Sequence, residues 1–161
     1  MEKTYIGYCK SPVGMIEITG SDVGITSINF IDDHKIDFKN SSTMMDDVVQ
    51  QLKEYFEGSR KEFDMKLDLQ GTEFQLQVWQ ELMKIPYGKT ISYLQLAKRI
   101  GNPKSIRAAA TANGKNPISI VVPCHRIIGA DGKLVGYSGG LSRKEFLLKL
   151  ENKLFGKDLF S

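Results

Sequence analysis

Residues 92–113 have the sequence SYLQLAKRIGNPKSIRAAATAN, which predicts two short helices joined by a turn. Ser92 is a residue type that caps helices, and it precedes a predicted helix over residues 93–100. Gly101 ends that helix, and the second predicted helix runs from about residue 104 to residue 113. Two short helices separated by a glycine-containing turn are typical of a helix-turn-helix.

The second of these helices carries almost no bulk. One long basic residue, Arg107, is followed by the small residues Ala108, Ala109, Ala110 and Thr111. Small side chains let a helix backbone come close to a partner surface, so we expect shallow docking on the DNA minor groove, with Arg107 inserted into the base stack. The pattern alone fits an alanine-rich helix buried by packing equally well.

The rest of the chain predicts an α+β protein of two domains. Alternating runs predict antiparallel strands, and periodic apolar residues predict helices. The expected strands are 4–10, 13–20, 24–31 and 63–69, and the expected helices outside the helix-turn-helix are 46–56, 73–84 and 142–151. Composition changes around Gly71, which predicts an N-terminal α/β domain over 1–70 and a C-terminal domain over 71–161.

Charge is divided unevenly between these two parts. Residues 1–68 carry 8 Lys/Arg and 13 Asp/Glu, a net charge of −5, whereas residues 69–161 carry 14 and 6, a net charge of +8. A basic C-terminal part suits the phosphate backbone of DNA. No apolar stretch approaches the roughly 20 residues that a bilayer span needs, and no secretory signal is visible, so we expect a cytoplasmic protein without a membrane partner.

A candidate nucleophile lies in the segment Pro123-Cys124-His125-Arg126. The thiolate is the reactive form of cysteine, and a neighbouring histidine or arginine favours it. Adjacent side chains on an extended segment point to opposite sides, so Cys124 and His125 need a bridging water or a tight turn to cooperate. An inert structural thiol is the alternative. Cys9 and His34 are too few ligands for a structural zinc, and we expect no metal and no cofactor.

Motif blocks from Gly71 to Glu151 point to one family. The chain resembles the O6-alkylguanine-DNA alkyltransferases, also called methylated-DNA-protein-cysteine methyltransferases, over about half of its length. The matching blocks, in chain order, are Gly71-Thr72-Glu73-Phe74-Gln75, Val78-Trp79, Ile85-Pro86-Tyr87-Gly88-Lys89-Thr90, Ser92-Tyr93, Leu96-Ala97, Arg107-Ala108, Asn116-Pro117, Pro123-Cys124-His125-Arg126, Gly136-Tyr137-Ser138-Gly139-Gly140 and Lys144-Glu145-Phe146-Leu147-Leu148. The resemblance implies a ribonuclease H-like N-terminal domain and a winged-helix-like C-terminal domain.

The resemblance also implies a single-turnover DNA repair reaction. The partner is duplex DNA that contains O6-alkylguanine, with O4-alkylthymine as a further candidate substrate, and the protein is expected to act as a monomer. A flipped nucleotide enters a pocket, and Cys124 takes the alkyl group by in-line displacement. His125 deprotonates Cys124 through a water, and Glu151 orients the imidazole. Asn116 braces the active-site turn, and Tyr93 rotates the nucleotide and donates to the base.

Further contacts to DNA or the base follow from the same resemblance. The groups expected to make them are Arg107, the helix residues Ala108, Ala109, Ala110 and Thr111, the carbonyl groups of Val121 and Val122, Tyr137, Ser138, Arg126 and Lys144. Lys144 is expected to stabilise negative charge on O6. The family often has glycine at the position of Ala110, so the extra methyl group should weaken docking modestly.

Two other functions compete with alkyl transfer. One is a non-catalytic helix-turn-helix sensor of alkyl damage, but such relatives lack the nucleophile that Cys124 supplies. The other is a thiol hydrolase that uses Cys124 and His125, although a hydrolase of small substrates needs neither a basic half nor an alanine-rich helix.

Overall fold

The computed structural model describes residues 3–37 and 41–155 and forms two compact units. The first unit is Met1–Thr72 together with Pro117–Val121, and the second is Glu73–Asn116 together with Val122–Ser161. Residues 117–121 therefore belong with the first unit, which a single boundary near residue 70 does not include. Parts of the expected domains, at residues 1–2, 38–40 and 156–161, lie outside the described residues.

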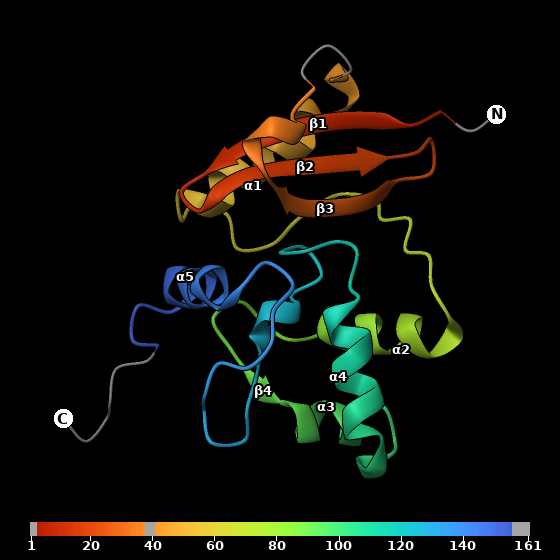
Figure 1. Cartoon of the computed structure of the whole chain (residues 1–161), viewed down its shortest axis with the longest axis vertical. Coiled ribbons are helices and arrows are strands. Elements are labelled where there is room, and N and C mark those ends of the chain that lie inside the picture. Colours follow the sequence, from red (N-terminus) through yellow and green to blue (C-terminus); the bar gives the residue numbers. More distant parts are fainter. Residues whose placement is uncertain (1–2, 38–40, 156–161) are drawn as a thin grey trace. The chain divides into compact units, whose positions relative to one another are not determined.

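The first unit is built on a three-stranded antiparallel sheet. Strands β1 (Tyr5–Ser11), β2 (Gly14–Gly20) and β3 (Ile25–Ile31) follow one another in that order. The first hairpin pairs Ser11 with Gly14, whose φ of 122° suits glycine. Helix α1 (Asp46–Phe56) lies against one face of the sheet (Figure 1), and its buried stripe contains Val48, Leu52 and Tyr55. These elements agree with the sequence pattern.

The expected strand over residues 63–69 does not form. Only Leu67 makes an isolated bridge, to Ile25, where the Ile25 N–H donates to the Lys66 carbonyl at 2.8 Å. Farther along β3, Ile28 is bonded to residues 117–119 instead. The outer edge of β3 is thus shared by two segments, and neither pairs along enough of it to become a strand.

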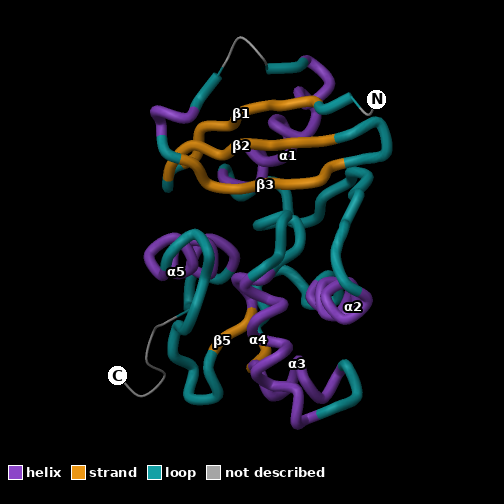
Figure 2. The backbone as a smooth tube through the Cα atoms, turned by 45° about the vertical axis from the view of Figure 1, so that its right-hand side comes forward, coloured by secondary structure: helices purple, strands orange, loops and turns teal. Residues whose placement is uncertain are grey.

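The second unit contains four helices among the described residues. They are α2 (Glu73–Leu82), α3 (Tyr93–Arg99), α4 (Ile106–Gly114) and α5 (Leu141–Glu151). A short parallel pair, β4 (Ile91–Ser92) and β5 (Ile127–Ile128), lies among them, and Figure 2 shows both strands near α3 and α4. The mixed α+β class, with the three-stranded sheet and α1 in one unit and the other helices in the second, matches the sequence prediction.

Helices α3 and α4 form the predicted helix-turn-helix. Ser92 accepts from the Gln95 N–H at 3.1 Å, and the Gln95 side chain accepts from the Ser92 N–H at 2.8 Å, so α3 begins with a capping box. Gly101 takes a φ of 92° in the turn. A 3₁₀ turn over Pro103–Ser105 precedes α4, so the α-helix begins at Ile106 rather than near residue 104.

Trp79 fixes α2 against α4. Its side chain is buried, and the indole Nε1–H donates to the Ala112 carbonyl at 2.9 Å. Ala109 and Ala112 provide the small surface on which α2 packs, since both are buried on α4. The alanines therefore serve packing on one side of α4. Across residues 3–37 and 41–155, no helix combines the length and the apolar character that a membrane span requires.

Candidate active site

The site is centred on a tight turn that holds Cys124. Residues Cys124–Arg126 form a 3₁₀ turn, which begins with the Cys124 N–H donating to the Val122 carbonyl at 2.8 Å. Asn116 Nδ2 donates to the same Val122 oxygen at 2.8 Å and braces the turn. Of the two expected ways to let Cys124 and His125 cooperate, the structure therefore contains the turn.

The Cys124 thiol is buried, with 3% of the residue exposed. Burial raises its pKa, while a hydrogen bond from Asn116 and the charge of Lys144 act in the opposite direction. Since burial dominates, the thiol is protonated at neutral pH and needs a base before it can attack.

His125, Glu151 and Arg126 form a buried network next to this thiol. His125 Nε2 lies 2.6 Å from Glu151 Oε2, and Arg126 donates to both carboxylate oxygens, at 2.7 Å from Nε and 3.1 Å from Nη2. Arg126 Nη1 also donates to the Ile85 carbonyl at 2.7 Å. Burial disfavours the ionised Glu151, but His125 and the Arg126 guanidinium outweigh it and hold its pKa below the usual range.

This network sets the state of the imidazole. Burial lowers the pKa of His125, so the ring is neutral at pH 7. A neutral ring that donates from Nε2 to Glu151 carries its acceptor lone pair on Nδ1. Nδ1 is buried and has no hydrogen-bond partner within the described part of the chain. His125 is thus bonded to Glu151 through one ring nitrogen, while the other is a buried acceptor without a partner in the described residues.

Two side chains hold the loop that follows β5. Lys144, fully buried at the start of α5, donates from Nζ to the carbonyl groups of Val135 at 2.8 Å and Gly136 at 3.0 Å. Burial lowers the pKa of Lys144 to about 8. The Tyr93 hydroxyl donates to the same Val135 carbonyl at 2.9 Å, and burial raises its pKa, which keeps it a donor.

A partly open pocket lies between this loop and Cys124. Its volume is about 80 Å³, and its walls are Tyr93, Ala110, Asn113, Gly114, Cys124, Gly136, Tyr137 and Ser138. An apolar cavity that admits benzene has a volume of about 150 Å³. A purine is larger than benzene, so it needs more room than this pocket has in the present structure.

Several residues that were expected to contact DNA or the base are buried or hydrogen-bonded within the protein. The Arg126 guanidinium donates to Glu151 and to the Ile85 carbonyl, and the residue is buried. The Val122 carbonyl already accepts two hydrogen bonds, which leaves it no lone pair for a base. Val121 is buried and does not line the cavity. Ala109 is fully buried in the packing of α4.

Most of the α4 residues from which DNA binding was expected lie on the exposed side of the helix. Arg107, Ala108 and Thr111 are exposed, and Ala110 is partly exposed where it reaches the cavity wall. Within the described ranges, the Arg107 guanidinium forms no hydrogen bond or ion pair. The Thr111 hydroxyl donates to the Arg107 carbonyl at 3.0 Å, so it is satisfied within the helix.

Sequence reasoning missed Asn113 and the role of Arg126. Asn113 is buried and lines the cavity. A signal for it exists, because Ala109, Ala112 and Asn113 share one helical face, and an asparagine on a core face needs an explanation. No local signal reveals the Arg126–Glu151 pair, since its partners are 25 residues apart.

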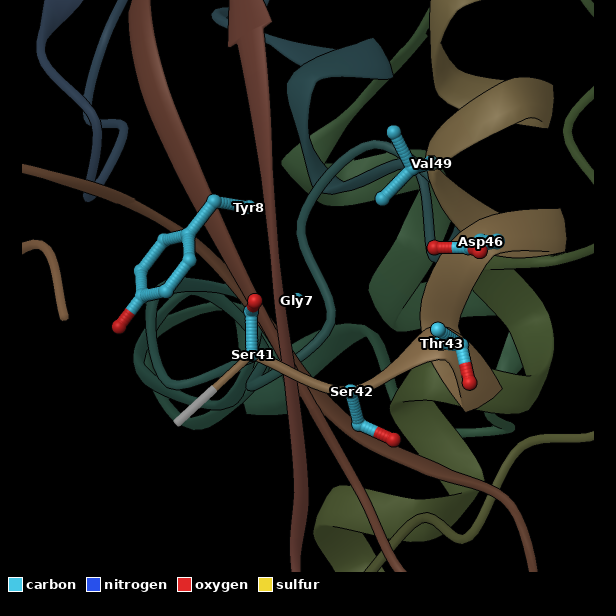
Figure 3. Close-up of a pocket in the computed structure, with 7 residues that line it drawn as sticks. All are labelled: Gly7, Tyr8, Ser41, Ser42, Thr43, Asp46 and Val49. Atoms are coloured by element: carbon cyan, nitrogen blue, oxygen red, sulfur yellow. The ribbon is translucent and has the colours of Figure 1, made fainter. Parts of the chain in front are cut away.

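A second hollow lies within the first unit (Figure 3). It has a volume of about 180 Å³ and is lined by Gly7, Tyr8, Ser41, Ser42, Thr43, Asp46 and Val49. Its side chains are hydroxyl groups, one carboxylate and one valine, from β1, the segment before α1, and α1 itself. Neither a thiol nor an imidazole lines it, so the second unit holds the stronger candidate.

The fold and the site together define a helix-turn-helix protein with a buried cysteine next to a buried network of histidine, glutamate and arginine. Comparison with known proteins gives its family. The model of the 6-O-methylguanine DNA methyltransferase DNA binding domain matches residues 73–153, and that of the ribonuclease-like domain matches residues 4–69. The chain belongs to the 6-O-methylguanine DNA methyltransferase family.

Individual relatives cover nearly the whole chain. The methylated-DNA–protein-cysteine methyltransferase of Methanosarcina acetivorans is 49% identical over 152 residues, which are 91% of this chain and 97% of the relative. That of Mycolicibacterium paratuberculosis is 47% identical and covers 89% of each chain. The crystal structure of Mycobacterium tuberculosis OGT in complex with DNA is 43% identical, covers 96% of this chain and 97% of that chain, and has a TM-score of 0.85.

Proposed function

We propose that this protein repairs duplex DNA by transferring the alkyl group of O6-alkylguanine to Cys124, once per chain. The observation that carries the proposal is the buried Cys124 thiol at a cavity wall, next to a neutral His125 whose Nδ1 is available and whose Nε2 is bonded to Glu151. The family membership and the DNA complex of the M. tuberculosis relative support it.

The reaction is a proton transfer followed by a displacement. His125 Nδ1 takes the thiol proton through one water, and the thiolate attacks the alkyl carbon in line with the C–O6 bond. The S–C bond forms as the C–O6 bond breaks, and the electron pair of the C–O6 bond stays on the guanine. The base is then neutralised by the proton that the thiol lost. A thioether has no easy leaving group, so Cys124 is consumed.

The surrounding residues serve this step in different ways. Lys144 is a nearby positive charge that favours the thiolate. Tyr93 and Lys144 both donate to the carbonyl of Val135, which directly precedes the lining residue Gly136. When a flipped base opens the loop, both side chains lose that partner and become available, Tyr93 as a donor to the base and Lys144 as a charge near O6. Tyr137 and Ser138 offer further polar groups at the wall.

Charge favours duplex DNA as the partner. Between Glu81 and Asp131 the chain contains 8 Lys/Arg and no Asp or Glu, and this stretch contains the helix-turn-helix. Each neutralised phosphate releases counterions and strengthens binding. Arg107 stands exposed at the start of α4, where it can fill the place of a flipped base. The expected monomer, the cytoplasmic location and activity on O4-alkylthymine stay predictions.

Intact-mass spectrometry after incubation with a duplex that contains O6-methylguanine tests the proposal. We expect one added methyl group per chain, with no second turnover. Cys124→Ser should gain nothing, whereas the matched variant Cys9→Ser, at a buried thiol of the first unit, should be methylated like the wild type. DNA binding without any mass change would show a non-catalytic damage sensor instead.

A further inference from the structure

The Glu151 carboxylate has two hydrogen-bond contacts on each of its oxygens. Oε1 accepts from Arg126 Nε at 2.7 Å and from the Gly88 N–H at 3.2 Å. Oε2 accepts from Arg126 Nη2 at 3.1 Å and lies 2.6 Å from His125 Nε2. A carboxylate offers about four lone-pair sites, so these contacts occupy the whole group. Arg126 and His125 therefore share one oxygen of the same buried anion.

The Arg126 guanidinium is held by partners other than this carboxylate as well. Its Nη1 donates to the Ile85 carbonyl at 2.7 Å, and its Cζ lies 5.8 Å from the centre of the Tyr87 ring. Only 7% of the residue is exposed, so salt and water screen its charge little. The positive charge is thus fixed beside Glu151 by contacts that do not involve His125.

The charges around His125 act on its proton in opposite directions. Burial and the cations Arg126 and Lys144 lower the pKa of His125, whereas the Glu151 carboxylate raises it. Because Arg126 bonds to both oxygens, it neutralises the anion that would otherwise stabilise an imidazolium. The titratable groups of this site are the anion Glu151, the cations Arg126 and Lys144, and Cys124 and Tyr87, which burial keeps neutral by raising their pKa values.

We propose that Arg126 is a positioning residue that keeps His125 neutral by neutralising and orienting Glu151. The guanidinium takes up Oε1 and shares Oε2, so the carboxylate orients the imidazole through Nε2 without charging it. The inference deepens the proposed function and rests on it, because a base for Cys124 must be neutral before the reaction. Once the thiol proton has reached His125, the same cation disfavours the imidazolium and promotes transfer of that proton to the released guanine.

Replacing the guanidinium by side chains of similar length tests the role of its charge. Arg126→Met removes the charge, and Arg126→Lys keeps it. NMR of the imidazole rings follows their titration directly, and His34→Gln assigns the signals, because the chain has two histidines. In the wild type and in Arg126→Lys, His125 should titrate below its ordinary value of about 6.5. In Arg126→Met, we expect its midpoint to rise by about one pH unit or more.

Single-turnover methyl transfer gives a second readout, which a purely structural role would not reproduce. A rise of one pH unit leaves about a tenfold smaller fraction of neutral imidazole at pH values below both midpoints. The rate of Arg126→Met should therefore be about tenfold lower than that of the wild type at acidic pH and should recover at mildly basic pH. Loss of packing alone would lower the rate equally at every pH.

Two further variants serve as a substitute and a control. Arg126→Gln is neutral but can still donate to the Ile85 carbonyl, so it replaces the methionine variant if that one does not fold by circular dichroism. Arg60→Met removes the arginine of another Arg–Glu pair, in which Arg60 Nε lies 2.8 Å from Glu54 Oε1 in the first unit. It should keep the wild-type midpoint of His125.

The outcomes separate the inference from the proposed function. An unchanged His125 midpoint in the neutral Arg126 variants, or a rate loss that is equal at every pH, overturns the role of Arg126. A midpoint in Arg126→Lys as high as that in Arg126→Met overturns it as well, because the charge would then not matter. A wild-type protein whose Cys124 is never methylated contradicts the proposed function, while the titrations of the variants still decide the role of Arg126.

Discussion

Replacing Glu151 by glutamine should damage stability and chemistry by separable mechanisms. The Glu151 carboxylate is buried and accepts from His125 at 2.6 Å and from Arg126 at 2.7 and 3.1 Å. Glu151→Gln keeps the shape but removes the charge, which leaves the Arg126 guanidinium buried without a counterion. Removing one partner of a buried ion pair costs about 3–5 kcal/mol.

The variant should remain folded despite this loss of folding free energy. Domains are stable by about 5–15 kcal/mol, so we expect Glu151→Gln to fold at 25 °C with a melting temperature lower by about 6–20 °C. The chemical effect should be of similar size in free energy. The new amide can present its NH₂ group to His125 Nε2, which moves the ring proton to Nδ1, where it blocks acceptance of the thiol proton. A carboxylate-to-amide change of this kind in a protease triad costs about 10⁴ in rate, and we expect a loss of about 10²–10⁴ here.

A second substitution separates the two effects. In the double variant Arg126→Met/Glu151→Gln, no unpaired charge remains, so most of the stability should return, as is common when a buried ion pair is replaced by apolar groups. The methyl-transfer rate should stay low, since the amide still faces His125. Thermal unfolding by circular dichroism and quenched single-turnover kinetics measure the two quantities.

Two results would refute this reasoning. A rate within about threefold of the wild type in Glu151→Gln would show that Glu151 does not set the tautomer of His125. A double variant no more stable than Glu151→Gln would show that the charge of Arg126 is not the source of the loss.

Three further predictions concern DNA, the loop and pH. Arg107→Ala should slow repair of duplex DNA at least tenfold while leaving reaction with a free alkylated base unchanged in the same mass assay, and equal losses on both would contradict a role in base flipping. Lys144→Met removes two hydrogen bonds from the loop, so hydrogen exchange at residues 135–137 should quicken about tenfold, and unchanged protection would contradict a role of Lys144 in holding this loop. The buried His125 has a pKa below its ordinary 6.5, and a base must be neutral to act. Methyl transfer should therefore fall at acidic pH with a midpoint below 6.5, whereas a midpoint at or above 6.5 would contradict a buried neutral base.

Local sequence signals were sufficient for most elements. The ranges of β1–β3, α1 and the helix-turn-helix follow from alternation, helical periodicity and punctuation by Ser92 and Gly101, because those signals act within a few residues. The prediction of a strand over residues 63–69 was wrong because an alternating sequence pattern does not show whether the edge of a neighbouring strand is free to pair. On β3, residues 66–68 compete with residues 117–119 for that edge.

By itself, the sequence determined the α+β class, the helix-turn-helix and the Cys124–His125 pair, because propensity, capping and covalent adjacency are properties of neighbouring residues. Only the tertiary structure decided that Arg126 donates to Glu151, that the Val122 carbonyl accepts from Asn116, and that the Asn113 amide donates to the Cys124 carbonyl. Each of these depends on which groups from distant segments are buried together. A buried charge or amide must find its partner inside the fold, and the chain order does not name that partner.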